Sequence, residues 1–362
     1  MTEIPESDRL EDLPHPRETL DLVGHEAEEA LFAGIRAGGR MPHAWLICGP
    51  QGIGKATLAY RMARAVLRHG VGGGPADSLS VPGDDPVARR IAAQAHPDLL
   101  ILRRPWDERT KRLKTVLNVD EVRRLNGFLA QHAGEGGWRV VIVDAADDMN
   151  ANAANALLKL LEEPPQKVLL LLVAHAPAKL LPTIRSRCRT LRLRPLAPDA
   201  VTEIVRRHGT AELSGEDAAL LAWLSRGSAG RALMLAAHGG LEIYKQITGL
   251  MSGLPEMDTA RLHRLADQAG GRGAEQSFAL TGELMSEAIE AVIHMKSGDA
   301  AGPPGSAGEG LGRAAALGRL DRWLEAWDKV RTVFGETATL NLDRKQALLS
   351  AGFLMKTASR EM

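Results

Sequence analysis

Short apolar runs alternate with longer stretches of helical periodicity along the first half of the chain. Apolar runs predict strands at residues 44–48, 96–102, 138–144, 168–173 and, shorter and alternating, 189–196. Between them, periodicity predicts helices at residues 26–39, 55–69, 86–94, 120–131 and 153–163. Buried strands separated by helices are typical of a parallel sheet covered on both faces. We therefore predict an α/β domain over residues 1–195.

Strand signals end at Pro195, and only helical periodicity follows. We predict a small helical lid domain over residues 196–240 and an all-α C-terminal domain over residues 241–362. The acidic residues 1–16 are expected to form a loose arm, and the glycine- and proline-rich residues 297–310 a flexible loop.

Composition narrows the class of protein. The 362 residues are 44% hydrophobic and 25% charged, which indicates a globular chain with more than one core. Two cysteines exclude a disulfide scaffold and cannot supply a four-cysteine zinc site. The N-terminus lacks the apolar core of a signal peptide, and no run of 18 apolar residues predicts a membrane helix. We expect a soluble cytoplasmic protein that does not contact membranes.

The segment between the first strand and the next helix matches the G-x-x-x-x-G-K part of a P-loop. Gly49, Gly52 and Gly54 would let the backbone curve around a phosphate and direct its N–H groups toward it. Lys55 would place a cation near the outer phosphates. The strand before it and the helix after it are the context that this chemistry requires. We predict a site for ATP or ADP here.

Two parts needed for hydrolysis are missing from that site. The Ser or Thr whose hydroxyl holds Mg²⁺ is replaced by Ala56, and Thr57 points about 100° further around the helix. Asp144 closes the strand at 138–144 and could contact Mg²⁺, but Ala145 follows it where a water-activating glutamate would stand. Mg²⁺ would be weakly held, and we predict little or no ATPase activity.

Several segments, taken in order, resemble one family. LVGHEAEEALFAGIRAGGRMPHAWLICGPQGIGKAT, VVIVDAADDMNANAANALLKLLEEPP, PTIRSRC and GSAGRAL are similar to the clamp-loader AAA+ subunits of bacterial DNA polymerase III, and most of all to the delta-prime subunits. These motifs span residues 22–233, and the helical remainder agrees with the collar domain of that family. The resemblance implies that the chain helps to load the sliding clamp onto primed DNA and has no polymerase activity of its own.

The resemblance also assigns roles to single residues. Arg187 of Ser-Arg-Cys corresponds to the arginine finger, which would reach ATP held by an adjacent gamma/tau motor subunit. Arg231 of Gly-Ser-Ala-Gly-Arg corresponds to the sensor-2 region, and Lys55 to a retained or vestigial ATP site. The implied partners are the gamma/tau subunits, the delta subunit and, through the complex, the sliding clamp and primer-template DNA. Many members carry a four-cysteine zinc module that this chain lacks, so we expect no zinc.

Two other readings of the P-loop are open. An autonomous AAA+ ATPase acting on DNA or protein would need the missing metal hydroxyl and carboxylate. A small-molecule P-loop kinase would not explain Ser-Arg-Cys or the long helical region. His175, at the end of the strand 168–173, could sense phosphate, although a histidine there is more often a hydrogen-bonded surface residue.

Charge is segregated along the chain. Basic and acidic residues balance at 45 each, yet residues 1–30 hold ten acidic and two basic side chains, and residues 179–194 hold six basic and none acidic. That basic run is expected to face a neighbouring subunit. The segment 103–114, with six basic residues and Trp106, predicts either a solvated charged hairpin or a track for a nucleic-acid backbone.

Overall fold

The computed structural model describes residues 5–9, 13–130, 137–208, 213–271, 273–299 and 302–360. The chain forms two compact units. The first, the sheet unit, comprises Met1–Val201 with Gly227–Gly230, and the second, the helical unit, comprises Thr202–Arg226 with Arg231–Met362. The division of the second unit's helices into a lid and a collar remains a proposal.

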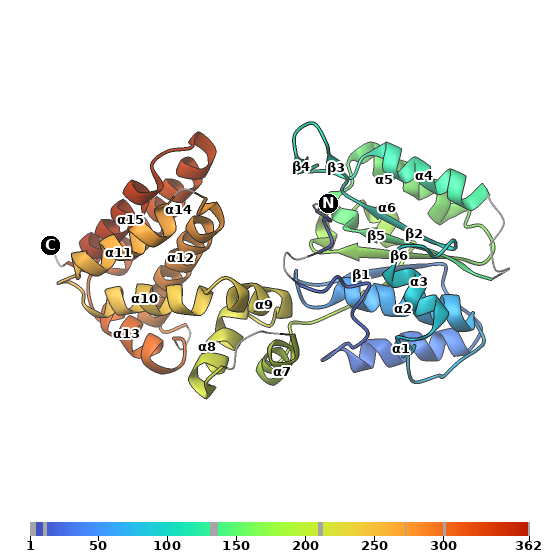
Figure 1. Ribbon diagram of the computed structural model, residues 1–362, viewed down its shortest axis with the longest axis horizontal. Coiled ribbons are helices and arrows are strands. Elements are labelled where there is room, and N and C mark those ends of the chain that lie inside the picture. Colours follow the sequence, from blue (N-terminus) through green and yellow to red (C-terminus); the bar gives the residue numbers. More distant parts are fainter. Residues whose placement is uncertain are drawn as a thin grey trace. The chain divides into compact units, whose positions relative to one another are not determined.

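A five-stranded parallel sheet organises the sheet unit (Figure 1). Its order is β2-β5-β6-β1-β7. The strands are β1 (Ala44–Cys48), β2 (Leu99–Arg103), β5 (Arg139–Asp144), β6 (Val168–Ala174) and β7 (Arg189–Arg192). The predicted parallel sheet is confirmed, and each strand lies within a predicted apolar run or within one or two residues of it.

Helices cover both faces of this sheet because side chains alternate between the faces along each strand. Trp45 and Ile47 pack with one set of helices, whereas Leu46 and Cys48 pack with the other. The first face meets α1 (Glu26–Ala37), α2 (Lys55–His69) and α3 (Pro86–Ala92). The second meets α4 (Val119–Ala130), α5 (Ala151–Glu162) and α6 (Pro182–Arg185) (Figure 1). The predicted helix 120–131 runs one residue past α4, to a position outside the described residues.

Short elements complete the sheet unit. An antiparallel hairpin of β3 (Trp106–Asp107) and β4 (Arg112–Leu113) follows β2, as one of the two interpretations of that charged segment predicted. Two 3₁₀ turns, η1 (Ala146–Asp148) and η2 (Pro177–Lys179), follow β5 and β6. They place polar groups beyond the carboxyl ends of these strands, where α/β sheets bind ligands.

The expectation of a loose arm over residues 1–16 is wrong for the residues of that segment that the structure describes. Asp8 and His15 have fully buried side chains, and Arg103 at the end of β2 pairs with Asp8. Composition alone suggested disorder, but a distant arginine supplies the partner that the acidic residues lack locally. Residues 1–4 and 10–12 lie outside the described part.

After β7, the helices and strands of the described residues are all helices. They are α7 (Pro198–His208), α8 (Gly215–Ser225), α9 (Ala229–Ala237), α10 (Gly240–Ser252), α11 (Thr259–Gly270), α12 (Glu275–Ser297), α13 (Gly305–Ala315), α14 (Leu320–Leu340) and α15 (Arg344–Ala358). None of the described helices is both long and apolar enough to cross a membrane.

The predicted flexible loop at 297–310 is wrong over its second half, because α13 begins at Gly305. Ala307, Leu311 and Ala314 are buried, so this helix has an apolar face despite its glycines. At Gly310 an added Cβ would lie 3.0 Å from the carbonyl oxygen of Thr248 on α10. Gly310, which has no Cβ, therefore allows α13 to pack closely against α10, although the glycine-rich composition of this segment is typical of a loop.

Candidate nucleotide site and exposed arginine

The P-loop has the backbone of a phosphate-binding turn. It connects β1 to α2, and Gly49, Gly52 and Gly54 all have positive φ. An added Cβ at Gly49 would lie 2.5 Å from the carbonyl oxygen of Leu193, and one at Gly52 would lie 2.3 Å from Ser228 Oγ. Glycine is required at these two positions by conformation and by space, as the motif predicts.

Lys55 points back into its own loop. Its ammonium donates to the carbonyl oxygens of Gly49, at 2.8 Å, and of Pro50, and the residue is 3% exposed. Burial lowers its pKa to about 8, against the opposing charges of Asp144 and Asp147. A nucleotide phosphate would have to replace these carbonyl contacts to bind the lysine.

Asp144 lies at the carboxyl end of β5, in register with Val173 of β6 and Arg103 of β2. Burial raises its pKa to about 7, and the nearby carboxylate of Asp8 raises it further, while Lys55 opposes both. A carboxyl that is part-protonated near neutral pH is a poor ligand for Mg²⁺, which is bound by ionised oxygen ligands. Ala56 supplies no hydroxyl beside it.

The two other acidic residues after β5 already have partners. Asp147 accepts hydrogen bonds from the backbone N–H groups of His175, at 3.0 Å, and Ala176, at 2.7 Å. Asp148 pairs with Arg104 at 3.0 Å. Burial lowers the pKa of His175, with help from Lys55, so its ring is neutral near pH 7. Asp147 thus holds the loop after β6, and both carboxylates have partners within the sheet unit.

The segment Gly227–Gly230 lies against the P-loop. The Gly230 N–H donates to the carbonyl of Gly52 at 2.8 Å, and Ser228 Oγ donates to the carbonyl of Gln51 at 2.9 Å. The loop is thus held in its shape by a segment distant in the sequence. The next residue, Arg231, belongs to the helical unit, where its guanidinium contacts Glu287 at 2.7 Å, Glu283 at 2.5 Å and the Leu224 carbonyl.

Arg187 has the opposite setting. It follows α6, and its guanidinium donates to the carbonyl of Thr183 at 3.0 Å and pairs with Glu162 at 2.9 Å. The side chain is 36% exposed, so both contacts hold it at the surface rather than bury it. The surrounding Arg185, Arg189 and Arg192 are exposed as well. The structure therefore groups Lys55 and Asp144 at one site, and places Arg187 on a separate basic surface.

A second polar cluster was not predicted from the sequence. Arg103 donates to Asp8 at 2.9 Å and also pairs with Glu6, while the Tyr60 hydroxyl donates to Asp8 at 3.3 Å. His15 Nε2 lies 3.3 Å from Asp8. Burial opposes ionisation of Asp8, but His15 and Arg103 together keep its pKa below the ordinary value. No local signal could have revealed these contacts, because Asp8 and Arg103 are 95 residues apart.

This cluster does not have the character of a metal site. Glu6, Asp8 and His15 offer ligand atoms within 4.8 Å of one another. However, the guanidinium groups of Arg17 and Arg103 already neutralise the two carboxylates. We conclude that the cluster attaches the N-terminal segment to β2 and α2.

Parts of this chain are similar to known proteins. Residues 24–197 match the family model described as DNA polymerase III, delta subunit. A DNA polymerase III subunit delta' of Pseudomonas aeruginosa is 41% identical over 44% of this chain and 46% of its own length. That of Escherichia coli is 38% identical over 57% of this chain and 58% of its own length. The matched segments thus span about half the length of these curated relatives.

More distant similarities extend further along the chain. The DNA polymerase III subunit tau of Escherichia coli is 28% identical over 76% of this chain and 41% of its own length. A crystal structure of a DNA polymerase III gamma subunit-related protein from Thermotoga maritima is 17% identical, with a TM-score of 0.40, over 91% of this chain and 99% of that one.

Proposed function

We propose, from the match of residues 24–197 to the family model described as DNA polymerase III, delta subunit, that this chain is a delta-prime subunit of a clamp-loader complex. In this role it helps to load the sliding clamp onto primed DNA, together with gamma/tau motor subunits and a delta subunit. Its own ATP site is degenerate, and Arg187 acts in trans on ATP held by the neighbouring motor subunit.

The exposed guanidinium of Arg187 is the observation that carries this proposal. An arginine finger must be held in place and yet remain free to reach a partner's phosphate, since it stabilises the charge that develops on the transferred group. Thr183 and Glu162 hold Arg187 at the surface, next to a run of further exposed arginines. Its planar, permanently charged group suits this role better than lysine.

The P-loop of this chain supports the same proposal, in which the chain acts on a neighbour's ATP and hydrolyses little or none at its own site. Lys55 is bonded to loop carbonyls, Ala56 has no hydroxyl, and Asp144 has a pKa raised to about 7. ATP or ADP would bind weakly here, with Mg²⁺ poorly held. The alternative, an autonomous AAA+ ATPase acting on DNA or protein, requires the metal and water chemistry that these residues do not supply.

Mass measurement after mixing the full chain with gamma/tau motor and delta subunits tests the proposal. We expect one discrete complex that contains this chain, and an ATPase rate for the isolated chain no higher than background. A chain that stays alone in every mixture would contradict the clamp-loader role. Turnover by the isolated chain that disappears in Lys55→Ala would instead favour the autonomous ATPase.

A further inference from the structure

We propose that the open edge of β2 is a docking site for an extended peptide segment of another protein, apolar along its length and acidic at the end that lies nearest the β3–β4 hairpin. The inference concerns a surface that the nucleotide site and Arg187 do not use. It rests on the hydrogen-bonding groups of the edge, on the cavity beside it and on the charge of the hairpin.

The two edges of the sheet differ in character. β7 exposes Arg189, Thr190 and Arg192, and charged side chains of this kind discourage pairing with another strand. On β2, which forms the other edge of the sheet, Leu99 and Ile101 are half-buried and apolar. At Leu99 and Ile101 the β2 edge therefore lacks the charged side chains that β7 has at the other edge of the sheet.

The register of β2 fixes which of its backbone groups point outward. Val140 donates to the carbonyl of Asp98 at 2.9 Å, so residues with even numbers face β5. In a parallel ladder the alternate residues then direct their groups away. The N–H and C=O of Ile101 and the C=O of Leu99 are thus available, and no residue in the described part of the chain bonds them through its backbone. An extended peptide has the complementary donors and acceptors.

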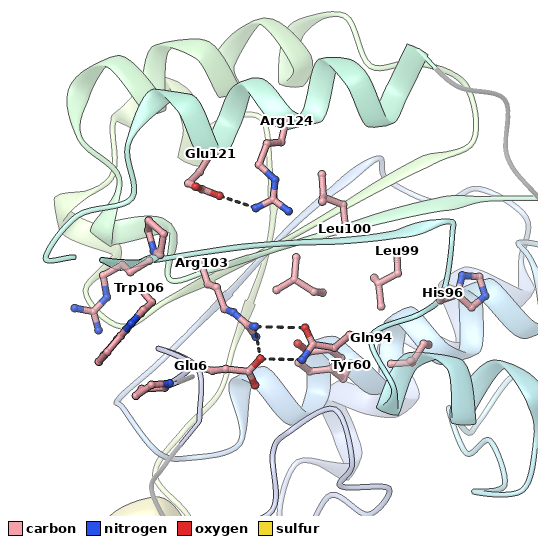
Figure 2. A pocket seen from close by; sticks show the side chains of 15 residues that line it. Glu6, Tyr60, Gln94, His96, Leu99, Leu100, Arg103, Trp106, Glu121 and Arg124 are labelled. Carbon is pink, nitrogen blue, oxygen red and sulfur yellow. Dashed lines mark hydrogen bonds and ion pairs between the residues drawn. The ribbon is translucent and has the colours of Figure 1, made fainter. Parts of the chain in front are cut away.

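A cavity of about 430 Å³ lies along this edge (Figure 2). Tyr60 and Ile91 line it on the side of α2 and α3, and Glu121 and Arg124 line it on the side of α4. Both faces of an added strand would consequently meet side chains of this protein. The apolar groups Ile91, Leu99 and Ile101 favour aliphatic side chains on one face of the peptide.

The basic charge of the segment 103–114 indicates that the acidic end of the peptide lies nearest the β3–β4 hairpin. The segment 103–114 carries six basic and two acidic residues. Arg103 and Arg104 are paired within the protein, whereas Arg109, Arg112 and Lys114 are exposed on or beside the hairpin. A nucleic-acid backbone is less well matched, because a chain of phosphates along the edge would meet the carboxylates of Glu6 and Glu121 in the cavity.

Binding of a designed peptide to the full-length protein tests the proposal. The probe is a fluorescein-labelled peptide of ten residues, alternating valine and threonine, with three aspartates at one end. Fluorescence anisotropy gives its affinity, and hydrogen exchange followed by NMR reports on the Ile101 N–H. We expect saturable binding at micromolar concentrations and at least tenfold slower exchange at Ile101. Aspartates at the N-terminal or the C-terminal end distinguish the two strand directions.

Two changes isolate the backbone contacts. Ile101→Pro removes an outward N–H without removing a bond to β5, and we expect affinity to fall at least tenfold, whereas Ile101→Val should bind as the wild type does. Methylating alternate backbone nitrogens of the peptide removes its donors and leaves the protein untouched, so the test stands even if Ile101→Pro fails to fold. One of the two methylation registers should abolish binding.

The proposal is overturned by any of three results. These are no saturable binding by either peptide, equal binding by both methylation registers, or unchanged exchange at Ile101 in the bound protein. Displacement of the peptide by a thymidine oligonucleotide of similar length, with matching protection of Ile101, would assign the edge to nucleic acid and would also overturn it.

Discussion

Lys55 of the P-loop and Arg187, the proposed arginine finger, have opposite settings in this protein. Lys55 is 3% exposed and bonded to the carbonyl oxygens of its own loop. Arg187 is 36% exposed, and it contacts Thr183 and Glu162 at the surface. A cation whose donors are used within the fold contributes little to a ligand, whereas an exposed one can serve a neighbour. This difference supports the proposal of a subunit that supplies Arg187 to the ATP site of a neighbour and does not use Lys55 for hydrolysis.

The first prediction tests the exposed side of this comparison and has the largest expected effect. In the complex reconstituted with motor subunits, Arg187→Ala should lower ATP hydrolysis at the one adjoining site by roughly 10³-fold or more. Arg187→Lys should restore little, because it lacks the planar fork. Clamp- and DNA-stimulated ATPase rates measure the effect, which other intact sites in the complex would dilute.

Its control is Arg185→Ala, which changes another exposed arginine two residues away. We expect the free energy of unfolding of the Arg187→Ala protein to stay within about 0.5 kcal/mol of the wild type, since exposed ion pairs contribute little. An unchanged ATPase rate in a complex shown by mass to contain the variant would remove the proposed role of Arg187.

The second prediction concerns Arg103, a half-buried cation that pairs with a buried carboxylate. Arg103→Ala leaves the buried carboxylate of Asp8 without its arginine partner, whereas Glu6 keeps Arg17. Breaking such a pair typically costs about 3–5 kcal/mol, so we expect a loss of that order in the free energy of unfolding, measured by denaturant titration. The exposed Arg109→Ala should cost less than about 0.5 kcal/mol. Equal stability of the two variants would mean that the N-terminal segment is not held by Arg103.

The third prediction uses the pH dependence of Asp144. Its pKa is raised to about 7 in the folded protein, so the folded state keeps a proton that the unfolded state loses. The stability that this proton confers is complete below about pH 4 and is lost as the pH rises to about 7, at up to roughly 1.4 kcal/mol per pH unit.

Asp144→Asn removes this titration. The free energy of unfolding of the variant, relative to the wild type, should therefore rise between about pH 4 and pH 7 and level off above that. Denaturant titrations at several pH values measure the difference. Parallel curves for the two proteins across that range would show that Asp144 titrates normally and remains fully ionised at neutral pH.

The smallest effect is expected at the lysine itself. Lys55→Met removes the cost of burying an ammonium but also removes the donor to the carbonyl oxygens of Gly49 and Pro50, and because these effects oppose each other we expect a stability change of about 1 kcal/mol. ATP hydrolysis by the complex should be unchanged. A loss of activity as large as that of Arg187→Ala would show that the lysine takes part in catalysis and would break the comparison.

Much of the sheet unit follows from the sequence because its signals are local. The run VVIV before Asp144 and the run at 168–173 have no polar position to expose, so each is expected to lie in the middle of a sheet. Glycine spacing and the missing hydroxyl at Ala56 likewise predicted the shape of the loop and its lack of a metal ligand. The sequence did not predict the helix that begins at Gly305, because its glycine-rich composition is typical of a loop. The close contact with α10 that Gly310 allows is visible only in the tertiary structure.

The sequence by itself determined the order of strands and helices along the chain, the P-loop with its missing hydroxyl and the Ser-Arg-Cys segment. Tertiary structure decided which groups are available. In it, Lys55 donates to the carbonyl oxygens of its own loop, Asp8 is buried against Arg103, Arg187 is exposed, and no strand of the described residues pairs with the outer edge of β2. The physical reason is that pairing and desolvation depend on residues distant in the chain, and local pattern carries no information about them.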